Sequence, residues 1–263
     1  MSPRLVFSHG RPAAVLVAAL LAAPGAPAAP PVPSTPSTKV APSPTVDEIV
    51  GRYVAARGGI LKLRALRTLR QEGRVSAGAG RNGLVTREIK RPGKIRFELT
   101  VQGVTSVFAS DGQRGWKVTP LEGETGPRPL PEEALVDARE QADIDGPLVD
   151  WKSKGSRIEL AGREAVDGRD AYKLKLTLKS GGVITAYVDV DSASLVRTEA
   201  TRHVRGKDVR IETTFGDYRK TEGILFPHLV EVRAAGRPQV LRIVVDKVEV
   251  NPPLSDARFV PPA

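Results

Sequence analysis

The chain has 263 residues, of which 40% are hydrophobic, 27% are charged and none is cysteine, and its formal net charge is +10. This composition is typical of a soluble globular protein with a basic surface, and it excludes a disulfide scaffold and an intrinsically disordered chain. Lysines and arginines are spread along the sequence, and only 5% of the residues are aromatic, so the chain does not favour nucleic-acid binding. A basic face of this kind is instead attracted weakly to anionic lipid or to an acidic partner.

The first 28 residues have the order of a secretory signal peptide. Arg4 and Arg11 precede the apolar residues 13–23, and small residues follow up to Ala28. The apolar run is shorter than the roughly 20 residues that a membrane-spanning helix needs. We therefore expect export, cleavage near Ala28, and no transmembrane segment in the mature chain. No cysteine is present there to carry a lipid anchor.

Residues 29–44 are rich in proline, serine and threonine, which predicts an extended linker before the folded domain. The domain is expected to comprise residues 45–263. Thr45 and Glu48 have the spacing of a capping box, and apolar residues then recur at helical intervals up to Gly58. The domain is therefore predicted to open with an amphipathic helix.

Between residues 67 and 250, short stretches that alternate apolar and polar residues are separated by glycine, aspartate and asparagine turns. Residues 94–102 and 172–179 show the alternation most strictly. This rhythm predicts a single antiparallel meander of about ten strands. In the last strand the apolar phase slips between Val245 and Val248, which predicts a β-bulge or a strand buried on both faces.

The rhythm is interrupted by one further predicted helix, which begins at Pro131. Two helices are too few to cover the apolar face of so long a curled sheet, so we expect a concave, partly vacant apolar groove of the kind that holds small ligands. Trp116 and Trp151 fit either this site or the core. The candidate lining residues are Ile49, Val50, Tyr53, Phe97, Leu99, Trp116, Leu135, Leu174 and Leu176.

The sequence contains few of the residues that catalysis needs. His203 and His228 lie apart without metal-ligand spacing and are interpreted as surface or strand-edge residues. No cysteine nucleophile and no GxSxG motif is present. Asp143 and Asp145 only faintly suggest a calcium loop and are interpreted as a helix exit and turn. We expect no metal, no cofactor and no enzymatic activity, although the sequence does not test for a pair of carboxylates.

Two motifs resemble the LolA-like family of periplasmic lipoprotein carriers. They are IKRPGKIRF at residues 89–97 and SDGQRGWKVTP at residues 110–120. Residues 45–59 (TVDEIVGRYVAARGG), 215–228 (FGDYRKTEGILFPH) and 251–259 are similar to the outer membrane lipoprotein-sorting branch of this family. The order and spacing of these segments make the resemblance more specific than any one of them.

The resemblance implies a mainly β (α+β) fold, in which a single curled antiparallel sheet of about eleven strands forms an incomplete barrel. Lid helices then lie on the concave face, over an apolar cavity that holds acyl chains. In the family the arginine before the turn proline hydrogen-bonds to the lid helices, so Arg91 is the implied lid-control residue. Interpreted from the sequence alone, Arg91 is equally a solvent-facing turn arginine.

The leading hypothesis is a soluble periplasmic carrier, or chaperone, that binds the acyl chains of lipoproteins or similar lipids and delivers them towards the outer membrane. An inner-membrane donor and an outer-membrane acceptor are the implied protein partners. The alternative is an envelope sensor or assembly factor that acts through protein-protein contacts, with its own side chains filling the groove. A third hypothesis is a hydrolase acting on envelope lipids.

Overall fold

The computed structural model describes residues 43–78, 82–124, 126–204 and 207–262. The expected signal peptide and all but the last two residues of the expected linker lie outside these ranges. Within them, no helix has both the length and the apolar character needed to cross a membrane.

The described chain forms three α-helices, two short 3-10 helices and thirteen strands. The helices are α1 (Val46–Ala56), α2 (Ile60–Ala65), α3 (Glu132–Gln141), η1 (Pro120–Glu122) and η2 (Asp256–Arg258). The first strands are β1 (Thr68–Ala77), β2 (Asn82–Lys90), β3 (Lys94–Val101), β4 (Val104–Ser110), β5 (Gly115–Val118) and β6 (Arg128–Pro129). The remaining strands are β7 (Arg157–Val166), β8 (Arg169–Thr177), β9 (Val183–Asp189), β10 (Leu195–Val204), β11 (Lys207–Thr221), β12 (Ile224–Ala234) and β13 (Val240–Val250).

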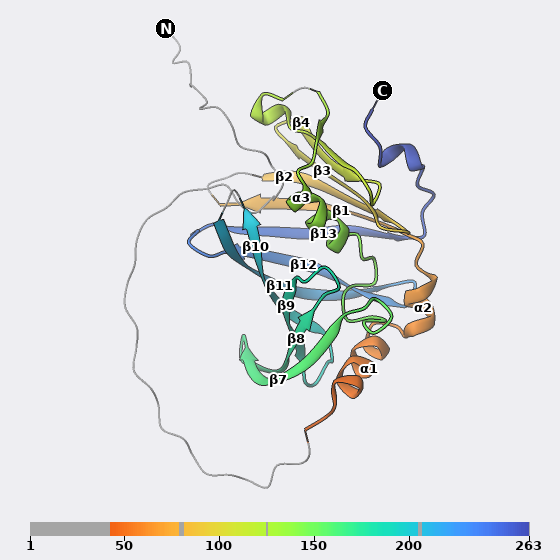
Figure 1. Ribbon diagram of the computed structural model, residues 1–263, viewed down its shortest axis with the longest axis vertical. Coiled ribbons are helices and arrows are strands. Elements are labelled where there is room, and N and C mark those ends of the chain that lie inside the picture. The colour runs from red at the N-terminus through yellow and green to blue at the C-terminus, as the bar shows by residue number, and fades with distance from the viewer. Residues whose placement is uncertain (1–42, 79–81, 125, 205–206, 263) are drawn as a thin grey trace.

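All thirteen strands belong to one antiparallel sheet in the order β6-β5-β4-β3-β2-β1-β13-β12-β11-β10-β9-β8-β7 (Figure 1). The order describes two meanders, β1 to β6 and β7 to β13, that join where β1 pairs with β13. The outermost strands, β6 and β7, are neighbours in sequence. The segment that connects them must therefore travel from one edge of the sheet to the other, and it contains α3, which crosses in front of the sheet (Figure 1).

The expected fold class is confirmed, because a single curled antiparallel sheet that does not close into a barrel accounts for most of the domain. The expected number of strands is too low. Of the thirteen strands, β5 has four residues and β6 has two. Both lie among glycine and proline residues, and neither is long enough to show the alternation that identifies a strand in the sequence.

Helix α1 begins with the predicted capping box, in which the Thr45 hydroxyl accepts from the Glu48 backbone N–H and the Glu48 carboxylate accepts from the Thr45 backbone N–H. Its side chains Ile49, Val50 and Tyr53 are buried. They belong to the main hydrophobic core, which also contains Leu63 and Leu66 from the α2 segment. On the sheet side, this core includes Leu174, Leu176, Ala186 and Val188, all at most 1% exposed.

The predicted bulge is present in β13. Glu72 pairs with Lys247 and Gly73 with Val245, so Asp246 is the additional residue. Gly73 is required at this point because a Cβ there would clash with the carbonyl oxygen of Val244. The bulge increases the local twist at the centre of the sheet, where the two meanders meet.

The C-terminal residues cover the other, convex face of the first meander. Phe259 is fully buried, and its carbonyl accepts a hydrogen bond from Trp116 Nε1 at 3.1 Å. Arg258 pairs with Glu88 at 2.6 Å.

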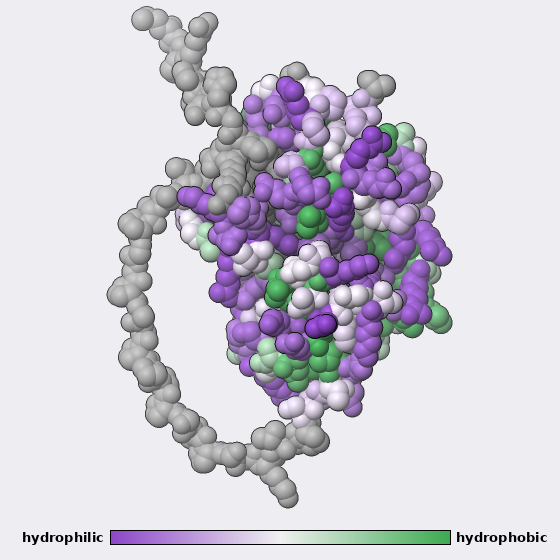
Figure 2. All heavy atoms as spheres, in the orientation of Figure 1, coloured by the Kyte–Doolittle hydropathy of each residue, from purple (hydrophilic) through white to green (hydrophobic). Residues whose placement is uncertain are grey.

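On the side of the molecule seen in Figure 2, hydrophilic side chains predominate and hydrophobic ones appear only in small areas.

Candidate functional site: a concave cavity beneath α3

A cavity of about 550 Å³ lies on the concave face between α3 and the sheet. This volume falls within the range of about 300 to 1,000 Å³ that is usual for small-ligand sites. Strands of both meanders contribute to its wall. The aromatic lining residues are Tyr53, Phe97, Phe108, Phe215, Tyr218 and Phe226, and the aliphatic ones include Leu69, Val85, Ile95, Ile144, Ile184, Leu195, Ile211, Val230, Val232, Leu241, Ile243 and Val245.

Three phenylalanines in this wall are not packed as core residues are. Phe97 and Phe108 face each other across β3 and β4, and Phe215 pairs with Val230 between β11 and β12. All three are only half-buried, although burial is worth about 1.5 to 3 kcal/mol for a side chain of this size. The concave face therefore presents apolar surface that the protein's own side chains do not cover.

Helix α3 gives this surface little apolar cover, because its apolar side chains in the cavity wall are short and the others, Asp137, Glu140 and Gln141, are polar. Ala134 and Ala138 line the cavity. Leu135 is buried, and α3 packs against β3 and β4. A helix with alanines at these positions stays close to the sheet at one side and cannot fill the space at the other.

Polar contacts from three separate parts of the sheet hold α3. Arg202 of β10 pairs with Asp137 at 3.3 Å and with Glu140 at 2.6 Å. Arg87 of β2 donates to the carbonyl of Gln141 at 2.7 Å. Arg139 Nε donates to the carbonyl of Gly112 in the turn before β5 at 3.1 Å. The helix thus connects β2 with β10 over the cavity, mainly through charged groups.

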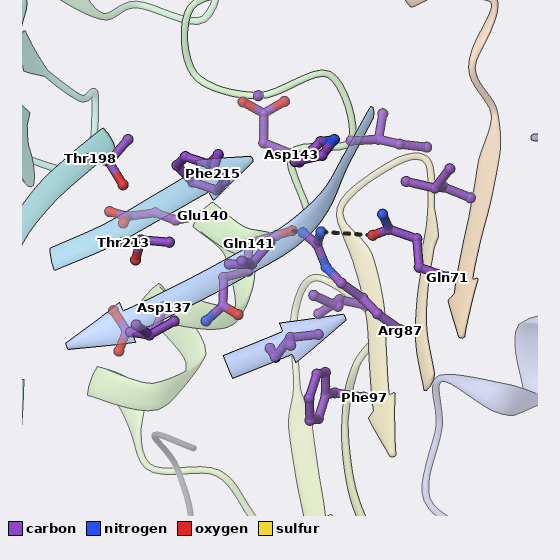
Figure 3. A pocket seen from close by; sticks show the side chains of 18 of the residues that line it. Gln71, Arg87, Phe97, Asp137, Glu140, Gln141, Asp143, Thr198, Thr213 and Phe215 are labelled. Carbon is purple, nitrogen blue, oxygen red and sulfur yellow. Dashed lines mark hydrogen bonds between the residues drawn. The ribbon is translucent and has the colours of Figure 1, made fainter. Parts of the chain in front are cut away.

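Arg87 is the charged residue at the centre of Figure 3. It lies on the concave face of β2, where it pairs with Gln71 of β1 and with Phe97 of β3. Its guanidinium donates to Gln71 Oε1 at 3.3 Å as well as to the Gln141 carbonyl. Burial lowers the pKa of Arg87 to about 10, which still leaves the side chain charged at neutral pH.

A second cluster fixes the loop that follows α3. Asp145 is 2% exposed, and its carboxylate binds Arg91 at 2.8 Å and Lys154 at 3.0 Å. Lys154 also binds Asp143 at 2.7 Å. Burial, with the neighbouring Asp145 carboxylate, raises the pKa of Asp143 to about 6. For Asp145, the interactions with Asp143, Arg91 and Lys154 overcome burial and lower the pKa to about 2.

Arg91 joins this loop to α2. Its Nε donates to the carbonyl of Leu66, just beyond the C-terminus of α2, at 2.7 Å. A longer contact of 3.5 Å reaches the Leu63 carbonyl. A cation is favoured at a helix C-terminus, where carbonyl groups are left without partners. Arg91 therefore bridges α2 and the Asp145 loop, although it does not reach α3 itself.

Among the residues that the structure describes, no group of His, Asp and Glu side chains could hold a metal ion. His203 is exposed and lies 3.0 Å from Asp208. The expectation of a surface or strand-edge position is wrong for His228, which is 5% exposed and bonds through Nδ1 to the Val245 carbonyl at 2.7 Å. Its strand, β12, lies between β11 and β13 in the interior of the sheet.

The structure distributes the nine candidate lining residues over five places. Tyr53 and Phe97 line the cavity. Ile49, Val50, Leu174 and Leu176 lie in the filled core under α1, and Leu135 is buried on α3. Leu99 is half-buried outside the cavity wall. Trp116 lies on the convex face, with the Arg96 guanidinium 5.5 Å above its ring.

Several lining residues were not singled out from the sequence. Ile211, Thr213 and Phe215 follow one another on the same face of β11, and all three line the cavity. Their alternation was visible, but nothing in it separates a residue that faces a cavity from one that faces the core. Arg87 had a clearer signal, because it occupies the apolar phase of β2 between Val85 and Ile89.

No family model and no curated protein matches this sequence. Solved structures do match. A DUF1329 family protein from Desulfovibrio piger superposes with a TM-score of 0.57 at 17% identity, over 82% of this chain and 97% of that one. A LolA superfamily protein from Nitrosomonas europaea superposes with a TM-score of 0.54 at 14% identity, over 83% of this chain and 98% of that one. A putative outer membrane lipoprotein-sorting protein domain from Vibrio parahaemolyticus superposes with a TM-score of 0.53 at 11% identity, over 81% of this chain and 94% of that one.

At these identities the likeness concerns the fold, and it extends over nearly the whole of each matched chain. The expected resemblance is thereby confirmed at the level of architecture. The curled thirteen-stranded sheet, with a helix over its concave face, is a LolA-like fold.

Proposed function

We propose that this protein is a carrier that binds acyl chains of lipoproteins or similar lipids in the concave cavity and moves them through the periplasm towards the outer membrane. The observation that carries the proposal is the cavity of about 550 Å³ with half-buried phenylalanines in its wall. An aliphatic chain would cover this apolar surface without any specific polar contact. The matched lipoprotein-sorting protein domain supports the same assignment.

The energetics favour a carrier over free diffusion of the cargo. Each methylene transferred from water to an apolar site contributes about 0.8 kcal/mol, so a 16-carbon chain contributes on the order of 12 kcal/mol. A lipid bound so strongly needs a route of release. The described residues include no group that could hold a metal, and the proposed role requires binding and release without a covalent step.

Movement of the α3 segment would provide that route. The helix is held mainly by hydrogen bonds and ion pairs, and its following loop is held by Arg91 and Lys154. Individual contacts of this kind contribute roughly 1 to 3 kcal/mol, so breaking a few of them shifts the open and closed populations measurably. In this proposal Arg91 controls the lid indirectly, by fixing the Asp145 loop to α2.

Lipid extraction from the purified mature protein tests the proposal. We expect mass spectrometry to find copurified acyl lipids, and we expect the delipidated protein to take up a fluorescent fatty acid. Absence of both would overturn the carrier assignment and would favour a sensor or assembly factor acting through protein contacts. Release of a free fatty acid from an added lipid ester would instead indicate a hydrolase.

The variant Arg91→Leu tests the proposed control of the lid. It removes the bonds to Leu66 and Asp145, so we expect the fluorescent fatty acid to dissociate faster. Arg64→Leu is the matched control, because Arg64 forms an ion pair with Asp150 from the exposed side of α2. If Arg91→Leu and Arg64→Leu release the ligand at the same rate as the unmodified protein, Arg91 has no part in the lid.

A further inference from the structure

The inference concerns a charged group in the sheet wall of the cavity that has no carboxylate partner, the guanidinium of Arg87. No carboxylate of the described residues lies within ion-pair distance of it, and its only hydrogen-bond acceptors are the uncharged oxygens of Gln71 and Gln141. A guanidinium carries five N–H donors, and these two bonds leave several without a partner. Arg87 also lines the cavity, so its free donors are accessible from the space that a ligand would occupy.

Three other charges that are shielded from water have an opposite charge beside them. The next residue, Glu88, points to the opposite face, is 1% exposed, and pairs with Arg258 at 2.6 Å. Lys117 is 4% exposed and pairs with Glu124 at 3.2 Å. Asp145 has two cationic partners. Arg87 is half-buried and has no carboxylate beside it, so its charge is balanced only by two uncharged oxygens, one of them at the C-terminus of α3.

The other charged residues of the cavity wall do not supply the missing charge. Asp137 and Glu140 are both bound to Arg202. Glu72 is bound to Arg70 at 2.6 Å, and Asp143 to Lys154. Figure 3 shows Asp137, Glu140 and Asp143 apart from the Arg87 guanidinium, which extends between Gln71 and the end of α3.

The immediate neighbours of Arg87 are apolar. Phe97 lies directly across on β3, and Val85 precedes Arg87 on the same face of β2. A ligand that binds the guanidinium therefore places the rest of its atoms against hydrocarbon. The complementary molecule has one oxyanion, to form a charge-assisted and geometrically matched bond with arginine, and an aliphatic chain attached to it.

We propose that Arg87 binds the oxyanion of an amphiphile, a carboxylate or a phosphate, whose acyl chain lies in the cavity. This inference rests on the proposed function, and it adds that the cargo has an anionic group inside the cavity next to its chain. The anion would also lie beside the C-terminus of α3, because Arg87 donates to the Gln141 carbonyl. Occupation of the site is thereby coupled to the position of the helix.

Competition binding with three 12-carbon amphiphiles tests the inference on the unmodified protein. Laurate, dodecyl phosphate and 1-dodecanol have the same chain, and each is measured by displacement of a fluorescent fatty acid. We expect laurate, dodecyl phosphate or both to bind about 10- to 100-fold more tightly than dodecanol, as a charge-assisted hydrogen bond implies. Equal binding of all three would overturn the Arg87 site and leave the carrier function standing. No binding of any of them would overturn both.

Variants then assign the preference to Arg87. Arg87→Met is expected to lose the preference for the anions over dodecanol, whereas Arg87→Lys is expected to keep part of it. Arg87→Gln keeps an N–H donor for the Gln141 carbonyl and serves if Arg87→Met fails to fold. Arg74→Met is the matched control, because Arg74 is an exposed arginine of the neighbouring strand that pairs with Asp246. A preference that survives in Arg87→Met and in Arg87→Gln would refute the inference.

Discussion

Helices α1 and α3 both cover the concave face of the same sheet, but they cover it differently. Under α1 the apolar face is filled, and Leu174 and Leu176 are fully buried. Under α3 it is left open, and Phe97 and Phe215 are half-buried around a cavity. Since the strands alternate in the same way in both halves, the side chains of the covering helix decide whether a strand residue becomes core or cavity wall.

The two helices are also attached by different forces. Helix α1 inserts Ile49, Val50 and Tyr53 into the core, whereas α3 is held by Arg202, Arg87 and Arg139. Apolar insertion is non-directional and is lost only when the core opens, while a few polar bonds can exchange with water one at a time. The comparison assigns stability to the α1 half, and the proposed function places ligand binding in the α3 half.

The largest expected effect is a loss of stability in the α1 half. Leu174→Ala removes a fully buried side chain from a filled core and is expected to lower the free energy of unfolding by about 2 to 5 kcal/mol. Phe215→Ala, its counterpart in the cavity wall, should cost less than about half of that, because its site is already partly open. Urea denaturation of both variants measures the difference, and equal losses would contradict the division into two halves.

The second-largest expected effect is the loss of stability when the Asp145 cluster is broken. Asp145→Asn removes a buried carboxylate from Arg91 and Lys154 and should lower the free energy of unfolding by about 1.5 to 3 kcal/mol. Asp150→Asn is the control, because its partner Arg64 is 60% exposed and such pairs contribute at most about 1 kcal/mol. The same urea series compares them. A larger loss in Asp150→Asn would show that the Asp145 cluster does not fix the loop.

Filling the cavity from α3 should change binding more than stability. Ala138→Phe places a large apolar side chain in the space that we assign to the acyl chain, and we expect at least about a tenfold weaker binding of a fluorescent fatty acid. The thermal midpoint of unfolding of Ala138→Phe should fall by no more than the midpoint of an ordinary surface variant falls. Ala55→Phe, at an exposed position of α1, is the control. Unchanged affinity in Ala138→Phe would place the ligand elsewhere.

The smallest expected effect is a dependence of the free energy of unfolding on pH, which arises in the loop after α3. The pKa of Asp143 is raised to about 6 in the folded protein, mainly by burial, so the folded loop keeps a proton that the unfolded chain releases near pH 4. The stability contribution of this proton is complete below about pH 4 and is lost as the pH rises through about 6. Asp145, with its pKa lowered to about 2, has the opposite sign: its contribution is complete above about pH 4 and is lost as the pH falls towards about 2.

Urea titrations at about pH 4 and about pH 7 check this sign. Relative to Asp143→Asn, the unmodified protein should lose stability over that interval. A relative gain would mean that ionised Asp143 is stabilised by Lys154 more than it is penalised by burial.

The sequence predicted those features that depend on local periodicity. The capping box of Thr45 and Glu48, the helix after Pro131 and the bulge before Val248 are local, and the structure contains all three. The two-residue strand β6 is set by pairing with β5 and has no local signature. Pairing partners far apart in sequence, such as β1 with β13, likewise follow from the arrangement of the whole sheet.

The candidate site was predicted less completely, for a physical reason. Leu174 and Phe97 belong to equally regular strands, and only the helix above each determines its exposure. Trp116 is buried on the convex face, where it bonds to Phe259, a residue 143 positions away. Arg87 was visible as a charge in the apolar phase of β2, but its missing partner becomes apparent only in three dimensions.

Photo-crosslinking with a diazirine fatty acid tests the central claim most directly, because it locates the acyl chain on the sheet. After irradiation and digestion, we expect labelled peptides to contain Phe97 of β3, Phe108 of β4 or Phe215 of β11. Peptides that carry Leu174 and Leu176 should remain unlabelled, since these side chains are fully buried under α1. Label on the β8 peptide or on the convex face, with none in the cavity wall, would contradict the account.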